Sequence, residues 1–201
     1  MAYSSFKTLK EIEVAFGVKN QRVSLFRDVV PCEMSEDLKK AILLAQELPI
    51  KSEKARSELI VTPILLEVRN LNHKVFTIYS GDNLNVDETR GLNGECDFII
   101  AKDTGSFEVS YPIIQLVEAK KNDVEIGLPQ CAAQMIGAKI WNDKNNASLS
   151  VMYGCVTTGD DWLFLKLTDD MLFIDVKKYY LGNIAELLGV FQQVIADFKE
   201  V

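Results

Sequence analysis

The stretch "IIQLVEAKK", residues 113–121, decides how the sequence is interpreted, because it joins an apolar run to a charged end. The residues from Ile113 to Val117 are typical of a buried strand. Side chains at positions i and i+2 of a strand point to the same face, about 6 to 7 Å apart. The sequence therefore predicts that Glu118 and Lys120 project together from the end of a core strand.

Further apolar runs, separated by glycine, asparagine and aspartate, lie on both sides of this stretch. We expect the runs to be strands, at residues 74–80, 84–88, 95–101, 111–120, 148–158, 161–168 and 171–176. The first four follow one another closely, so they are expected to form an antiparallel meander.

Amphipathic patterns predict helices before, between and after these strands. The expected helices cover residues 35–48 with a serine cap, residues 52–70 with a kink at Pro63, residues 127–143 with Pro129 in the first turn, and a closing segment from about Asn183. The order of elements predicts an α/β (α+β) fold with a mixed central β-sheet flanked by helices. We expect one compact unit, with residues 1–50 as a helical N-terminal extension and residues 51–201 as the main domain.

Composition and charge narrow the class of protein. The chain has 201 residues, 48% of them hydrophobic and 25% charged, which is ordinary for one globular domain. No stretch approaches the roughly 18 unbroken apolar residues of a membrane span, and the N-terminus lacks the apolar centre of a secretory signal. We therefore expect a cytoplasmic protein that does not enter a membrane. The net charge of −7 counts against a protein that coats nucleic acid by bulk electrostatics.

Cysteine and histidine are too sparse for several common kinds of site. The four cysteines lie far apart with no CxxC pair, so neither a zinc site nor a disulfide framework is indicated. His73 is the only histidine, which leaves little basis for a histidine-dependent triad. Any chemistry is expected to depend on carboxylates and lysine.

Asp97 gives the charged strand end a partner. It stands at the head of the apolar run 97–101, one hairpin before Glu118, so antiparallel pairing would bring the two carboxylates together. Carboxylates about 4 Å apart repel by about 4 kcal/mol at an effective dielectric of 20, and such a pair needs a proton or a cation. Oxygen ligands select Mg²⁺ or Mn²⁺, with the carbonyl of Ala119 as a further ligand beside Asp97 and Glu118. A metal site of this kind serves phosphodiester hydrolysis, in which Lys120 would orient the nucleophile or stabilise negative charge.

These features together resemble the PD-(D/E)XK nuclease superfamily, which has the restriction-endonuclease-like fold. The segments "SEKARSELIVTPILLEV", "GECDFII", "LVEAKKND" and "GLPQCAAQM" are similar to the nuclease domain of type I restriction enzyme motor subunits and related stand-alone bacterial proteins, over roughly residues 52–175. The resemblance implies Asp97 and Glu118 as metal ligands and Lys120 as the catalytic lysine.

The same resemblance implies an acidic residue on the preceding helix and polar residues on the following one. Glu58 or Glu53 would complete the acidic cluster, and we prefer Glu58 because it adjoins an apolar stripe. Gln134 and, with less support, Gln130 would face the cleft. The chain departs from the family pattern where Gln134 replaces a tyrosine and where Glu95 and Cys96 replace the proline before the aspartate.

Three hypotheses follow from the sequence. The first is Mg²⁺-dependent hydrolysis of DNA by an endonuclease or nuclease-like protein, and the second is a catalytically silent binding or assembly module with the nuclease fold. In the third, residues 1–50 form a docking surface for a partner or for a homodimer. A structural ion pair at a sheet edge is the alternative explanation of Glu118 and Lys120.

Overall fold

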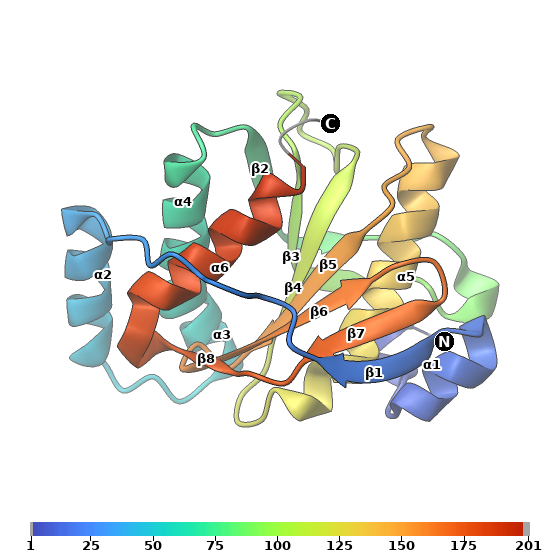
Figure 1. Cartoon of the computed structure of the whole chain (residues 1–201), viewed down its shortest axis with the longest axis horizontal. Coiled ribbons are helices and arrows are strands. Elements are labelled where there is room, and N and C mark those ends of the chain that lie inside the picture. Colours follow the sequence, from blue (N-terminus) through green and yellow to red (C-terminus); the bar gives the residue numbers. More distant parts are fainter. Residues whose placement is uncertain (1, 199–201) are drawn as a thin grey trace.

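The computed structural model describes residues 2–198, and within them a single mixed sheet runs through the molecule (Figure 1). The strands, in chain order, are β1 (Lys19–Val23), β2 (Phe76–Asn83), β3 (Glu95–Lys102), β4 (Ile113–Ala119), β5 (Met152–Thr157), β6 (Asp161–Leu167), β7 (Met171–Asp175) and β8 (Tyr179–Tyr180). In this part of the chain they form one eight-stranded sheet in the order β1-β7-β6-β5-β4-β3-β2, with β8 paired to β6. The pairs β1–β7 and β4–β5 are parallel and the others are antiparallel, which confirms the expected α/β fold with a mixed sheet.

Helices cover both faces of the sheet. They are α1 (Leu9–Phe16), α2 (Glu36–Gln46), α3 (Glu53–Arg56), α4 (Thr62–Leu71), α5 (Leu128–Lys144) and α6 (Ile184–Ala196). Helices α1 and α5 pack on one face, while α2, α4 and α6 pack on the other (Figure 1). Strand β4 lies between the two layers, and every one of its residues is buried, as its apolar sequence predicts. No helix in residues 2–198 is long and apolar enough to cross a membrane.

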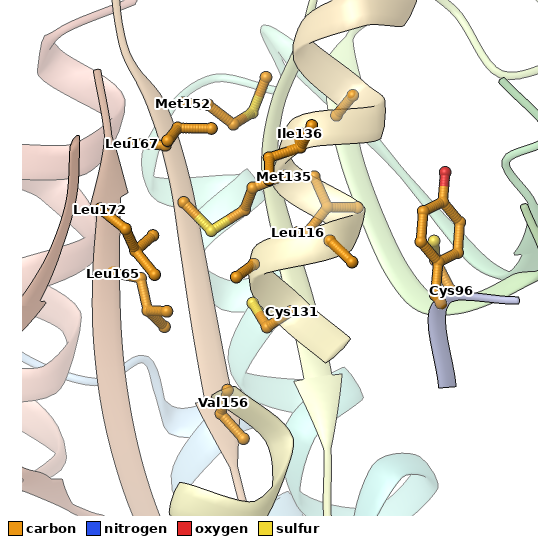
Figure 2. Packing of buried hydrophobic residues seen from close by; sticks show 14 of the residues in the cluster. Cys96, Leu116, Cys131, Met135, Ile136, Met152, Val156, Leu165, Leu167 and Leu172 are labelled. Carbon is orange, nitrogen blue, oxygen red and sulfur yellow. The ribbon is translucent and has the colours of Figure 1, made fainter. Parts of the chain in front are cut away.

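Packing against the sheet fixes the position of α5, the helix that faces the charged end of β4. Cys131, Met135 and Ile136 of α5 are directed at the sheet (Figure 2). The helix approaches closely at Gly154 of β5, where a Cβ atom would lie 2.4 Å from the sulfur of Met135 and 2.9 Å from that of Cys131. A side chain at this position would therefore push α5 away from the sheet.

The second expected helix is present but changes its winding. Ser52 caps α3, its hydroxyl oxygen accepting a hydrogen bond from the amide of Ala55 at 3.0 Å. The helix then passes through a π-helical turn, Ser57–Val61, before it continues as α4. The kink was expected at Pro63, whereas the irregularity is this π turn, which ends at Val61, two residues before the proline. A π turn holds one more residue than an α turn, so it changes which side chains share a face.

Residues before α3 are more closely integrated than the expected helical extension. Strand β1 is part of the sheet, paired with β7 from the other end of the sequence. Near the N-terminus, the side chain of Tyr3 is 1% exposed, and its hydroxyl donates a hydrogen bond to the carbonyl of Leu84 at 2.8 Å. The N-terminal segment therefore shares the core of the main domain.

The prediction of a strand at residues 84–88 is wrong. Residues 84–88 form no strand; they contain a single bridge between Asp87 and Leu92 and lead into a short 3-10 turn, Glu88–Arg90. The side chain of Asp87 accepts a hydrogen bond from the amide of Arg90 at 3.2 Å and so caps this turn. Local capping by aspartate competes with strand pairing here.

Candidate metal-dependent active site

The hairpin of β3 and β4 brings Asp97 to the end of β4. The strands pair antiparallel with Phe98 opposite Val117, as the sequence predicts. Asp97 stands one residue further toward the open end, and its Oδ2 atom accepts a hydrogen bond from the amide of Ala119 at 2.7 Å. The carboxylate is thereby held next to the backbone that links Glu118 and Lys120.

Glu118 is the buried centre of the cluster, with 1% of its surface exposed. The ammonium group of Lys120 donates a hydrogen bond to its Oε1 atom, which confirms that the two side chains project together. Its Oε2 atom accepts a hydrogen bond from Nε2 of Gln134 at 2.7 Å. Gln134 lies on α5 and is fully buried, so the helix and the strand end are joined through this carboxylate.

Burial and mutual repulsion leave the two carboxylates poorly neutralised. Burial, followed by the charge of Asp97, raises the pKa of Glu118 to about 7, although Lys120 and Gln134 act to lower it. Burial also raises the pKa of Asp97, against the lowering effect of the Ala119 amide and of Lys120. Burial by itself would lower the pKa of Lys120, but the charge and the hydrogen bond of Glu118 outweigh it and the pKa is raised. The cluster therefore holds more negative charge than one lysine balances.

Of the two helix glutamates, the structure brings Glu53 to this cluster and not Glu58. The negative charge of Glu53 raises the pKa of both Asp97 and Lys120. Glu58, which we preferred, is 62% exposed, lies within the π-helical turn and faces Lys54 at 3.8 Å. The preference depended on the apolar stripe next to Glu58, and in the π turn between α3 and α4 Glu58 points to solvent although Ile60 is buried.

The other residues expected at the site are placed less directly. Gln130 is half-buried one turn before Gln134 on α5, and in the described chain only Gln134 of the two bonds to Glu118. Ala119 contributes its amide to Asp97, whereas its carbonyl was the expected metal ligand. Among residues 2–198, no three carboxylate, thiol or imidazole side chains are close enough together to hold a metal ion.

The donor set still fits a hard divalent cation better than a soft one. Cys96 and Cys131 lie near the cluster, but burial, followed by the charge of Glu118, raises the pKa of both thiols, so they stay protonated. What remains is two carboxylates, the nearby charge of a third, and neutral amide groups. Oxygen donors of this kind suit Mg²⁺ or Mn²⁺.

Two residues that the sequence analysis did not single out hold Lys120 in place. The backbone amide of Lys120 donates to the carbonyl of Thr157 at 2.7 Å, which extends the parallel pairing of β4 and β5. Gly127 lies against the stem of the lysine, where a Cβ atom would come within 3.1 Å of its Cγ atom and 2.5 Å of Val156 Cγ1. A glycine at the first position of the predicted helix 127–143 was the only sequence signal for this contact.

In comparisons with known proteins, no family model and no curated protein matches this chain.

Proposed function

We propose that this protein is a metal-dependent nuclease that hydrolyses phosphodiester bonds of DNA with a PD-(D/E)XK-type site and a restriction-endonuclease-like core. The observation that carries the proposal is the buried carboxylate pair of Asp97 and Glu118 at a strand end that also carries Lys120. A structural ion pair would require only one carboxylate. The second carboxylate raises the free energy of the fold unless a cation or a proton is present.

In this proposal Asp97 and Glu118 hold Mg²⁺ or Mn²⁺, with the Ala119 carbonyl beside them and Glu53 as a nearby negative charge outside the set of ligands. The bound cation would polarise the phosphate and lower the pKa of an attacking water. Lys120, directed by its backbone bond to Thr157, would stabilise negative charge that develops on the phosphate oxygens. Gln134 fixes the orientation of the Glu118 carboxylate through its hydrogen bond.

Cation binding and DNA cleavage test this proposal separately. Calorimetric titration with Mn²⁺ should detect one site in the wild type and none in Asp97→Asn, and plasmid DNA should be cut only with Mg²⁺ or Mn²⁺ present. Lys120→Ala should abolish cleavage, whereas Lys121→Ala, which removes the exposed neighbouring lysine, should leave it unchanged. Equal cleavage by the wild type, Asp97→Asn and Lys120→Ala would refute the assignment.

A catalytically silent binding or assembly module is the second candidate. The observation in its favour is that both oxygens of Glu118 already accept hydrogen bonds from protein groups, Lys120 and Gln134, so a cation would have to compete with them for this carboxylate. The net charge of −7 also acts against DNA binding. No binding of Mn²⁺ by the wild type, together with no affinity for DNA at low salt, would favour this function. Light scattering would show whether the module is a homodimer.

A further inference from the structure

Arg56 joins the helix that carries Glu53 to the turn between β5 and β6. Its Nη1 atom donates one hydrogen bond to the carbonyl of Thr158 at 2.9 Å and another to Oδ2 of Asp160 at 2.6 Å. The Arg56 side chain is 21% exposed and Asp160 is 60% exposed, so the ion pair is open to water, whereas the bond to the Thr158 carbonyl is partly buried. Ile60 of the π turn packs against Gly159 of the β5–β6 turn. A Cβ atom built on Gly159 would lie 3.4 Å from the Cδ1 atom of Ile60.

The β5–β6 turn is also hydrogen-bonded to Lys120. Thr157, the residue before Thr158, accepts the amide of Lys120 at its carbonyl, and its hydroxyl accepts the amide of Gly159 at 2.8 Å. The same hydroxyl donates to the carbonyl of Asp161 at 2.9 Å. Two hydrogen bonds, joined by the covalent backbone between Thr157 and Thr158, therefore link the Arg56 side chain to the backbone of the proposed catalytic lysine.

Arg56 is also close to Glu53, which lies three residues earlier in α3. Residues at i and i+3 of a helix are neighbours on its surface, so fixing Arg56 also fixes the direction of Glu53. Helix α3 is four residues long and continues through the π turn into α4, so it is the N-terminal end of a longer helix. The Ser52 cap and the Arg56 contacts hold this end.

We infer that Arg56 is a positioning residue, which holds the Glu53 helix and the Lys120 strand end in a fixed relation and so sets the cation affinity of the site. The cation affinity in this inference rests on the proposed function; the link from Arg56 to Lys120 does not. Residues that orient metal ligands typically change metal affinity by about 10- to 100-fold when they are replaced.

The chain offers a matched control in Arg69, on the same continuous helix. Its Nη2 atom contacts Oδ2 of Asp103 at 2.8 Å, its Nε atom donates to the carbonyl of Phe76 at 2.7 Å, and its side chain is 25% exposed. Arg69→Met should therefore lower the midpoint of urea denaturation about as much as Arg56→Met does. The contacts that Arg69→Met removes lie at the opposite end of the helix from Arg56. A general loss of stability would act alike in both variants.

Two measurements on the full chain test the inference. In hydrogen exchange without metal, Arg56→Met should speed exchange of the Lys120 amide and Arg69→Met should not. Unchanged exchange in Arg56→Met, or equal acceleration in both variants, would overturn the inferred link.

In Mn²⁺ titration, Arg56→Met should weaken binding about 10-fold or more, Arg56→Lys should weaken it less, and Arg69→Met should weaken it less than twofold. Equal affinity in Arg56→Met and the wild type would overturn the effect on the cation. Absence of Mn²⁺ binding by the wild type would refute the proposed function and with it the effect on affinity, while the exchange result still decides the link to Lys120.

Discussion

Replacing Glu118 with glutamine should stabilise the protein at alkaline pH while removing its proposed function. The pKa of Glu118 is raised from 4.5 to about 7, and each pKa unit corresponds to about 1.4 kcal/mol, so its ionisation opposes folding by about 3 kcal/mol. Between these two pKa values the folded chain holds a proton that the unfolded chain has released. Stability therefore falls as the pH rises from about 4.5 to about 7, and the loss is complete above that.

The glutamine side chain avoids this loss but gives up one contact. Its single carbonyl oxygen can accept from either Lys120 or Gln134, so one hydrogen bond made to a charged group disappears, at a cost of about 1.5 to 3 kcal/mol. The net gain at pH 8 is expected to be about 1 kcal/mol, and at pH 5 the variant should be less stable than the wild type. Urea denaturation at both pH values, with a chelator present, measures the difference.

A second buried glutamate supplies the control. Glu67 accepts hydrogen bonds from both the amide and the hydroxyl of Ser35, each at 2.7 Å, with no opposing carboxylate in the described contacts. Glu67→Gln should lower the free energy of unfolding by about 1 kcal/mol, because it replaces a buried carboxylate that only accepts hydrogen bonds. If the free-energy change of Glu118→Gln were the same at pH 5 and pH 8, the reasoning about a strained carboxylate would be refuted.

Three further substitutions test other contacts by urea denaturation. Gly127→Ala should cost about 1 to 3 kcal/mol, because its Cβ would press on Val156 and the stem of Lys120, and it should slow any cleavage; an unaffected variant would show that the contact does not hold the lysine. Gln115→Met should raise stability by about 1 kcal/mol or more, since the fully buried amide of Gln115 bonds to no described residue, and a loss would reveal a hidden partner. Tyr3→Phe should cost about 1 kcal/mol by removing a buried hydroxyl that bonds a backbone carbonyl; no change would mean that the N-terminal segment docks through packing alone.

The sequence could predict the hairpin of the site because its signals are local. Two apolar runs joined by the loop 103–112, which contains glycine and proline, specify β3 and β4, and the alternation of side chains then places Glu118 and Lys120 on one face. Gln134 follows from its place on α5, which Pro129 and the small apolar residues after it predict. None of these inferences needs knowledge of distant contacts.

What the sequence could not predict depends on distant or irregular geometry. Strand β1 has four exposed residues of five and pairs with β7 about 150 positions away, so it lacks both an apolar pattern and a nearby partner. The choice between Glu53 and Glu58 depends on a π turn that a regular helical projection does not contain. Arg56 has no motif at all; its importance arises from contacts with a turn about 100 residues later.

The electrostatic balance distinguishes a site from an ordinary ion pair. In a simple pair, the lysine would lower the pKa of its carboxylate partner, and burial of the two together would need no third group. Here the pKa of Glu118 is raised in spite of Lys120, and Asp97 and Lys120 also experience the charge of Glu53. Two buried carboxylates, with the charge of Glu53 nearby, thus face a single ammonium group. This imbalance lowers the stability of the fold, and selection for a function that uses the two carboxylates would account for that loss.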